Sequence, residues 1–419
     1  MEGVMEIKRD YYLNKLAERE ANGLIKIITG IRRCGKSYLL NNIFRNYLLS
    51  KGVEESHIIT VALDDIENES LLDGGELSKY IKSKIIDEDM YYILLDEIQL
   101  VDNFVPVLNG FLRVSNVDTY VTGSNSKFLS SDIVTEFRGR GDEIRVYPLS
   151  FSEFSSVYEE KTAAWNDYYT YGGLPLILLQ NSEVAKMDYL TSQAKNVYLN
   201  DVVERNNVQN KEALASLVEI ISSSIGSLTN PTKLYNTFRS KRNTTITDKT
   251  IHKYLNYLEE AFLIEKSKRY DVKGKKYIDT PLKYYFTDLG IRNSLLNFRQ
   301  QEESHIMENI IYIELKRRGF NVDVGVVGIR EKRGDAITRK QLEIDFIANK
   351  GNNKTYIQSA LNMPTKEKVE QEQRSLLNVD DNFKKVIIVK DDIKRKRDEN
   401  GLITMGVFDF LLDIHSLDY

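Results

Sequence analysis

Residues 30–37, Gly-Ile-Arg-Arg-Cys-Gly-Lys-Ser, constrain the fold of this chain more than any other segment. They follow a short apolar run, residues 24–29, and open a stretch with apolar residues at helical spacing as far as Ser50. A glycine-rich turn between a strand and a helix lets backbone N–H groups surround a phosphate, and the helix N-terminus adds the positive end of its dipole. The pattern G-x-x-x-x-G-K-[ST] therefore predicts a phosphate-binding loop, with Lys36 on the β- and γ-phosphates and the Ser37 hydroxyl on Mg²⁺.

A second segment, residues 91–97, is an apolar run that ends in the two carboxylates Asp96 and Glu97. A buried strand with this ending is typical of enzymes that cleave nucleoside triphosphates, because one carboxylate can hold Mg²⁺ and the next can polarise the attacking water. A strand cap followed by an exposed acid is the alternative, and the glycine-rich segment upstream argues against it. We therefore expect Asp96 to hold Mg²⁺ and Glu97 to act as the general base.

Two later segments could contribute to the same chemistry. In residues 120–126 an apolar run leads into polar residues, of which Ser124 or Asn125 could orient the water beside the γ-phosphate; a simple turn is the alternative. Arg138 and Arg140 could stabilise the charge of the transition state, either in their own chain or on a neighbouring copy, an effect worth about 10³–10⁵ in rate. Surface arginines are the alternative for this pair.

The spacing of apolar residues predicts an α/β fold for the N-terminal part of the chain. Short β-rich runs alternate with helical stretches, which is the pattern of a parallel sheet covered by helices on both faces. From residue 151 to about 225 the chain reads as helices, and from about 305 strands and helices are mixed again. The β-rich runs of the N-terminal part are residues 24–29, 57–63, 91–95, 119–122 and 143–146.

Five runs of this sequence resemble the prokaryotic AAA-family ATPases (AAA+ or STAND-like) that carry a C-terminal domain of unknown function. The runs are ITGIRRCGKSYLL, YYILLDEIQLVDNF, YVTGSNSKFLSSDIVTEFRGR, VYPLSFSEF and YGGLPLIL. They occur in the order typical of that family, and the match is specific over residues 1 to about 200. The resemblance implies that the nucleotide is ATP, that Asn125 acts as sensor 1, and that Arg138 or Arg140 is the arginine finger.

The resemblance also implies which residues surround the nucleotide. Gly172-Gly173-Leu174-Pro175 resembles the GxP motif of signalling P-loop ATPases, whose proline packs at the adenine, so Pro175 would help to close the pocket. Residues 7–11 lie where related proteins contact the base. The residues expected to contact ATP are Gly30, Arg33, Cys34, Gly35, Lys36, Ser37, Tyr38 and Pro175, with Ser37 and Asp96 as the Mg²⁺ ligands.

The pattern of residues 211–300 predicts a winged-helix domain. Three helical stretches, of which Asn230 and Pro231 open the second, precede a basic, β-like segment at 266–276 that would form the wing. Residues 231–300 hold 15 Lys and Arg against 7 Asp and Glu, although the whole chain has a net charge of −4. A solvated surface or a protein-contact module is the alternative to nucleic-acid binding. The side chains expected to face DNA or RNA phosphates are Lys249, Lys253, Lys266, Lys268, Arg269, Lys273, Lys275 and Lys276.

The last part of the chain, residues 301–419, resembles the restriction-endonuclease-like PD-(D/E)xK fold, in which acids and a lysine hold a metal and activate water. Glu308 on a helix, Asp345 on a strand and Gln358 on the next strand follow the order of that site. Ala360 stands where the lysine is expected. Two lysines of the following helix could replace it, Lys366 and Lys368. We expect a degenerate, inactive nuclease site, and an active nuclease is the alternative.

The expected architecture is α/β: a P-loop NTPase core (1–150), a helical lid (151–210), a winged helix (211–300) and a nuclease-like domain (301–419). We expect Mg²⁺-dependent ATP binding and hydrolysis by a motor or switch that acts on nucleic acid, with a homo-oligomer if the arginines act on a neighbouring copy. A switch acting on a protein partner and an ATP-gated nuclease are the alternatives.

The cysteine usage and the apolar runs of the chain bear on its compartment. Cys34 is the one cysteine, the N-terminus has no apolar signal-peptide core, and no apolar run is long enough to span a membrane. We therefore expect a soluble, cytoplasmic protein without a membrane segment.

Overall fold

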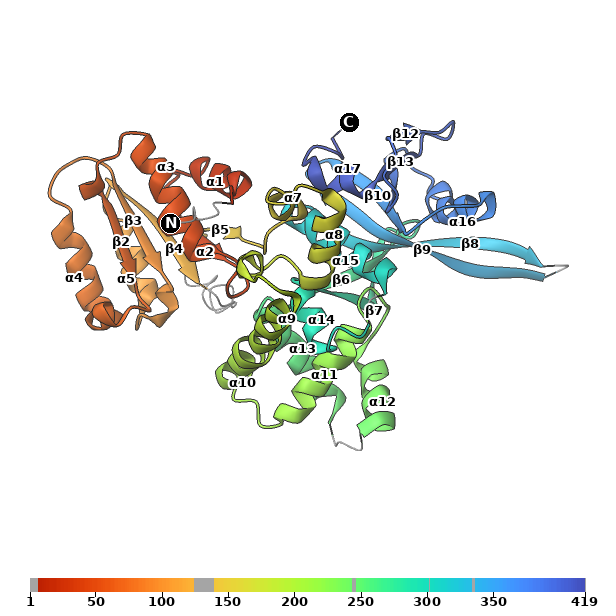
Figure 1. Cartoon of the computed structure of the whole chain (residues 1–419), viewed down its shortest axis with the longest axis horizontal. Helices are drawn as coiled ribbons and strands as arrows, with labels where there is room; N and C mark the ends of the chain where they lie inside the picture. The colour runs from red at the N-terminus through yellow and green to blue at the C-terminus, as the bar shows by residue number, and fades with distance from the viewer. Residues whose placement is uncertain (1–6, 124–138, 243–245, 301, 334–335, 419) are drawn as a thin grey trace. The chain divides into compact units, whose positions relative to one another are not determined.

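The chain folds into two compact units, shown in a computed structural model that describes residues 7–123, 139–242, 246–300, 302–333 and 336–418 (Figure 1). The first unit extends to Pro148 and includes the short segments Leu174–Leu176 and Glu260–Phe262. The second unit contains the rest of the described chain.

The first unit is built on a five-stranded parallel sheet, which confirms the predicted α/β fold. Its strand order is β2-β3-β4-β1-β5, so β4 lies between β1 and β3. Figure 1 shows the sheet enclosed by helices. The strands are β1 (Ile25–Thr29), β2 (Ile58–Ala62), β3 (Tyr91–Asp96), β4 (Val117–Gly123) and β5 (Gly141–Arg145). The helices are α1 (Asp10–Ala17), α2 (Lys36–Tyr38), η1 (Leu39–Phe44), α3 (Arg45–Ser50), η2 (Glu55–His57), η3 (Ile66–Leu72), α4 (Gly74–Lys84), η4 (Ile98–Leu100) and α5 (Phe104–Phe111).

Both faces of this sheet are buried because successive strand residues point to opposite sides. One face packs against α4 and α5, where Ile93 of β3 shares a core with Leu77 and Leu108. On the other face the ring of Tyr120 lies 4.5 Å from that of Phe44, on the helix that follows the glycine-rich turn. The near-continuous apolar strands of the sequence follow from this double coverage.

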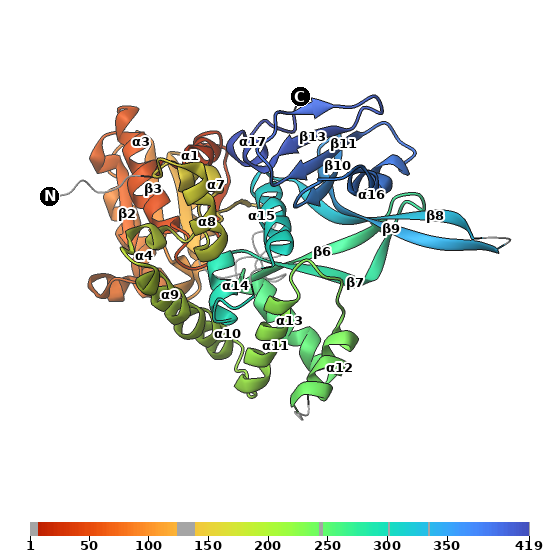
Figure 2. The same cartoon turned by 45° about the vertical axis from the view of Figure 1, so that its right-hand side comes forward.

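The second unit combines helices with an eight-stranded sheet of order β12-β13-β11-β10-β9-β8-β6-β7 (Figure 2). None of the helices in the described part of the chain is long and apolar enough to cross a bilayer. The helices are α7 (Phe151–Ser155), α8 (Lys161–Tyr171), η6 (Pro175–Leu179), α9 (Glu183–Ser192), η7 (Gln193–Leu199), α10 (Asn200–Arg205), α11 (Lys211–Ser223), α12 (Pro231–Arg242), α13 (Asp248–Glu260), α14 (Leu289–Leu295), α15 (Glu303–Arg317), α16 (Lys366–Leu377) and α17 (Val407–Leu412). The strands are β6 (Ile264–Asp271), β7 (Lys276–Phe286), β8 (Asn321–Arg333), β9 (Ala336–Lys350), β10 (Asn353–Ala360), β11 (Lys384–Val389), β12 (Lys396–Arg397) and β13 (Ile403–Gly406).

The hairpin β6–β7 belongs to the same sheet as the C-terminal strands. β6 runs parallel to β8, with Arg269 opposite Val324 and Asp271 opposite Val326. Three helices and this hairpin do follow one another over residues 211–286, in the order expected of a winged helix. Because the hairpin is hydrogen-bonded to β8, the expected boundary at residue 300 does not separate two sheets.

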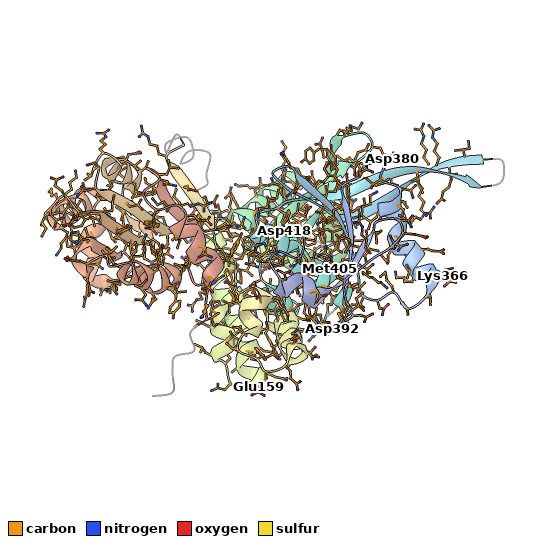
Figure 3. All side chains as sticks on the ribbon, turned by 90° about the horizontal axis from the view of Figure 1, so that it is seen from above. Glu159, Lys366, Asp380, Asp392, Met405 and Asp418 are labelled. Carbon is orange, nitrogen blue, oxygen red and sulfur yellow. The ribbon has the colours of Figure 1, made fainter. Side chains whose placement is uncertain are left out.

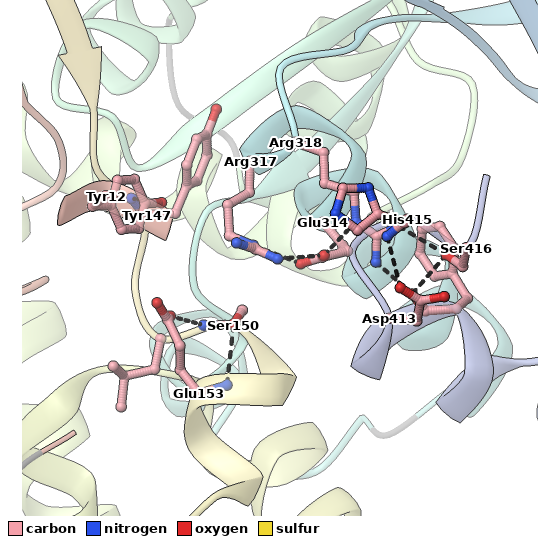
Figure 4. Close-up of polar contacts among 12 residues, drawn as sticks. Tyr12, Tyr147, Ser150, Glu153, Glu314, Arg317, Arg318, Asp413, His415 and Ser416 are labelled. Atoms are coloured by element: carbon pink, nitrogen blue, oxygen red, sulfur yellow. Dashed lines mark hydrogen bonds and ion pairs between the residues drawn. The ribbon is translucent and has the colours of Figure 1, made fainter. Parts of the chain in front are cut away.

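A buried ion network fixes the C-terminal segment to α15 (Figure 4). Glu314 accepts hydrogen bonds from the guanidinium groups of Arg317 and Arg318, both at 2.6 Å from its Oε1. Arg318 also donates to the hydroxyl of Ser416 at 2.9 Å and to the carbonyl of Phe410. All three charged side chains of the network are at most 5% exposed, so each depends on its partners for solvation.

We expect Glu314→Gln to lower the free energy of unfolding by about 3 kcal/mol, because it leaves two buried arginines short of negative charge. Chemical denaturation measures this change. Glu302→Gln, an exposed acid just before α15, is the matched control and should change stability by less than about 0.5 kcal/mol. A loss as small as that of the control would contradict the assigned role.

The same carboxylate predicts a pH dependence. Burial by itself would raise the pKa of Glu314, but Arg317 and Arg318 outweigh burial and lower it. A carboxylate with a lowered pKa stabilises the folded state above its unfolded pKa, about 4.3, and loses that contribution as the pH falls through the folded pKa. The stability of the wild-type chain should therefore fall more steeply below pH 4.3 than that of Glu314→Gln.

Candidate nucleotide site and a buried carboxylate cluster

The turn between β1 and α2 has a backbone shape that requires glycine at two positions. Gly30 has φ +145°, and a Cβ built there would overlap the carbonyl oxygen of Val146. Gly35 has φ +94° and precedes α2, where a Cβ would lie 3.6 Å from Arg9 Nη1 and 3.7 Å from Pro175 Cγ. Both conformations lie in the region that L side chains avoid. The turn is therefore tight and has no side chain at these two positions, as the sequence predicts for a phosphate loop.

Lys36 and Ser37 follow this turn at the start of α2. The Lys36 ammonium is 4% exposed and donates to the carbonyls of Gly30 at 3.0 Å and Ile31 at 3.1 Å. The Ser37 side chain is exposed, and its hydroxyl lies near enough to the Asp96 carboxylate to act on the pKa of Asp96. A cation and a hydroxyl thus lie together at the mouth of the loop.

Thr122 contacts both Asp96 and Glu97 at the end of β3. Its hydroxyl donates to Asp96 Oδ1 and accepts from the backbone N–H of Glu97 at 3.0 Å. Burial raises the pKa of Asp96, whereas the hydroxyls of Thr122 and Ser37 act in the opposite direction. Glu97 has φ +55°, and its side chain accepts from the amide of Gln99. The Thr122 hydroxyl of β4 therefore orients the carboxylate of Asp96 and holds the backbone of Glu97.

Two acceptors beside these carboxylates are buried without a hydrogen-bond partner among the described residues: Asn41 Oδ1 and Gln99 Oε1. The amide of Asn41 donates to Asp96 Oδ2 at 3.4 Å. Buried acceptors are normally satisfied, and Mg²⁺ in proteins keeps several of its waters, which can donate to such atoms. With the oxygen ligands of Ser37 and Asp96, the residues present fit a hydrated Mg²⁺ ion.

Arg9 holds the phosphate loop from outside, and nothing local in the sequence singled it out. Its guanidinium is 3% exposed and donates to the carbonyls of Cys34 at 2.8 Å and Tyr147 at 2.9 Å. The same guanidinium lies 4.6 Å from the ring centre of Tyr12, whose hydroxyl accepts from the N–H of Tyr147 at 3.0 Å. The segment expected to contact the base therefore also fastens the loop to the chain after β5.

Pro175 lies beside the loop. Its Cγ is 3.7 Å from the position that a Cβ at Gly35 would take. The preceding glycines are held within the second unit, where Asp288 accepts from the N–H of Gly173 at 2.8 Å. A Cβ at Gly172 would overlap the same carboxylate, and Asp288 also caps α14. The turn that leads to Pro175 is therefore held at its two glycines by Asp288.

The remaining predicted residues fall into three groups. Arg33 and Tyr38 are exposed, and Cys34 is buried with its Sγ 3.5 Å from the carbonyl of Val146. The carbonyl of Arg140 accepts from Ile25 N–H at 2.9 Å, so Arg140 lies at the amino end of β1, about 16 Å from the phosphate loop. Its guanidinium donates to Asn109 Oδ1 at 3.1 Å, and the alternatives for it are a surface arginine and a role on a neighbouring copy. Asn125 and Arg138 lie outside the described residues.

A second group of acidic residues surrounds Lys283 in the second unit. The Lys283 ammonium lies 2.9 Å from Glu308 Oε1, 2.8 Å from Glu343 Oε1 and 4.0 Å from Asp345 Oδ1. Burial opposes the charge of Lys283, but the three carboxylates outweigh burial and raise its pKa. Tyr285 donates to Glu308 Oε1 at 2.7 Å.

The residues predicted for the nuclease-like site do not all lie together in the structure. Asp345 accepts from the N–H of Ser359 at 2.8 Å, whereas Gln358 Oε1 accepts from Ser375 at 3.3 Å. Lys366 points outward from α16 in Figure 3, and Lys368 pairs with Glu372 at 2.6 Å. Glu308 and Asp345 are thus brought together as the sequence predicts. The cation beside them is Lys283, a residue that the sequence analysis left out.

The family described as "AAA domain" matches residues 22–155, and a domain of unknown function, DUF8612, matches residues 162–302. An uncharacterized protein of Haemophilus influenzae is 34% identical over 414 residues, which cover 97% of this chain and 98% of that protein. Uncharacterized protein MJ1544 of Methanocaldococcus jannaschii is 30% identical over 354 residues, 80% of this chain and 74% of that protein. Among solved structures, the Aeropyrum pernix ORC1 protein in complex with DNA aligns with a TM-score of 0.32 at 13% identity, over 70% of this chain and 93% of that chain.

The position of Arg9 predicts how the thiol of Cys34 reacts. We expect Arg9→Ala to speed the labelling of Cys34 by a thiol reagent at least about tenfold, because a hydrogen bond to a charged group contributes about 1.5–3 kcal/mol to keeping the loop closed. Cys34 is the chain's one cysteine, so the rate reports on the loop alone. Lys8→Ala, at an exposed neighbouring residue, is the control. Equal rates in the two variants would show that Arg9 does not hold the loop.

Proposed function

The chain belongs to one family with the Haemophilus influenzae protein and MJ1544 and carries an AAA domain, and from this we propose that it binds and hydrolyses Mg²⁺-ATP. The observation that supports the proposal most is the hydrogen bond from the Asn41 amide to Asp96 Oδ2. It joins the helix that follows the glycine-rich turn to the carboxylate that ends β3, at one edge of the sheet. Parallel α/β sheets bind their ligands at this edge.

Each residue of the site has a role that follows from its chemistry. The N–H groups of the loop and the Lys36 ammonium bind phosphate oxygens, and Ser37 and Asp96 hold Mg²⁺, which supplies positive charge to the transferring phosphoryl group. Glu97, whose backbone N–H donates to the Thr122 hydroxyl, accepts a proton from the attacking water. Pro175 closes the loop side of the pocket. The preference for adenine follows from the family and not from any residue described above.

The Glu97→Gln variant tests the general base. We expect ATP binding to be retained and turnover to fall by about 10²–10⁴, the usual contribution of a positioned general base. A fluorescent ATP analogue measures binding, and phosphate release measures turnover. Glu69→Gln, at an exposed acid of the same unit, should leave both unchanged, and Lys36→Ala should lose binding. Wild-type turnover in Glu97→Gln would refute the assignment of the base.

We further propose that the second unit binds nucleic acid through the basic residues of α13 and the β6–β7 hairpin. Lys249 and Lys253 are exposed and lie one turn apart on α13, so both can contact one phosphate backbone. Lys266 and Lys273 are partly neutralised, by Glu259 at 2.7 Å and Asp380 at 3.3 Å. The exposed residues Lys268, Lys275 and Lys276 extend the same basic stretch.

A salt titration of duplex binding tests this surface. We expect Lys249→Gln/Lys253→Gln to reduce the slope of log affinity against log salt by about 2, since each lost phosphate contact removes about 0.9. Fluorescence anisotropy of a labelled duplex provides the measurement, and Lys394→Gln/Lys396→Gln removes two exposed charges elsewhere in the unit. Absence of salt-sensitive binding in the wild type would favour a switch that acts on a protein partner.

A further inference from the structure

The carboxylate cluster of the second unit already contains a cation of its own. We infer that the Lys283 ammonium permanently occupies the place where a divalent metal ion would bind among Glu308, Glu343 and Asp345. The C-terminal unit of the wild-type chain would then hold no catalytic metal and cleave no nucleic acid. The inference is independent of the ATPase proposal, because none of these residues belongs to the nucleotide site.

The geometry of the hydrogen bonds supports this assignment. An ammonium offers three donors, and Lys283 lies within 4.0 Å of carboxylates that come from both α15 and β9. Glu308 Oε1 already receives both Lys283 at 2.9 Å and the Tyr285 hydroxyl at 2.7 Å. A metal ion needs direct bonds of about 2.0–2.6 Å to such oxygens, so it would have to displace the ammonium.

The surroundings keep Lys283 in this position. Its side chain is 3% exposed, and its backbone is paired with Ser267 across the β6–β7 hairpin. Behind Glu308, a Cβ at Gly226 would lie only 3.2–3.3 Å from the carboxylate, so that side of the cluster is filled by backbone. The ammonium is therefore enclosed on the side of the hairpin and on that of the Gly226 turn, and Glu343, with a side chain 34% exposed, lies at the solvent side of the cluster.

The charge balance of the cluster agrees with an internal cation. Three carboxylates and one ammonium leave excess negative charge in a buried place, which is costly. Lys283 offsets one of these negative charges with a group of the chain itself.

The test removes the charge of Lys283 and supplies a metal instead. We expect Lys283→Met to melt at a lower temperature than the wild type and to be restored by Mn²⁺, because Mn²⁺ can neutralise the vacated carboxylates. Wild type and Lys266→Met, which removes an exposed lysine of β6, should show no such restoration. Titration calorimetry should find a Mn²⁺ site in Lys283→Met that Asp345→Asn removes.

Three results would overturn the inference. Mn²⁺ binding by the wild type that Asp345→Asn removes, or metal-dependent cleavage of DNA or RNA that Asp345→Asn removes, would make Lys283 the working lysine of an active nuclease. If Lys283→Met folds but Mn²⁺ neither raises its melting temperature nor binds to it, the cluster is no cation site. If Lys283→Met does not fold, Lys283→Arg replaces it: the inference requires this variant to be stable and indifferent to Mn²⁺, and a requirement for the metal would refute it.

Discussion

The contact between the phosphate loop and the chain after β5 is the constraint on which the first unit depends. The backbone at Gly30 approaches the carbonyl of Val146 so closely that no side chain fits between them, and Arg9 binds the next carbonyl, that of Tyr147. The loop is thus clamped from two sides by segments more than 100 residues apart in the chain. A loop held in this way presents its N–H groups without first having to be ordered, which lowers the entropic cost of binding an anion.

Both acidic sites of the chain contain buried carboxylates that need a positive counter-charge, and the two sites differ in where that charge comes from. Asp96 is buried beside the exposed Ser37, and the two buried acceptors nearby that have no partner among the described residues are atoms to which the waters of a hydrated Mg²⁺ ion donate. In the cluster around Lys283 the counter-charge is covalently part of the chain and enclosed by strands. The first arrangement suits an ion that arrives with a substrate, and the second suits a permanent structural connection.

The sequence predicts those parts of the structure whose chemistry lies in contiguous residues. The glycines of the loop, the strand that ends in Asp96 and Glu97, and the alternation of β-rich and helical runs are all local patterns, and the parallel sheet confirms them. Glu308 and Asp345 were also found, because each lies on an element with a recognisable pattern. Arg9, Thr122 and Lys283 act through neighbours distant in the chain, and no local pattern marks such contacts. A weak signal existed for Lys283, a lone cation in the otherwise apolar end of a strand, and the surrounding surplus of surface lysines obscured it.

The position of the β6–β7 hairpin limits where this chain can be divided into parts. It lies in the segment that precedes α15, yet it supplies the edge of the C-terminal sheet and the cation of the carboxylate cluster. A break in the chain near residue 300 would leave the three carboxylates without their lysine and would remove the neighbour of β8 on one side, β6. Residues 264–406 therefore have to be kept together in any truncation or domain exchange of this protein.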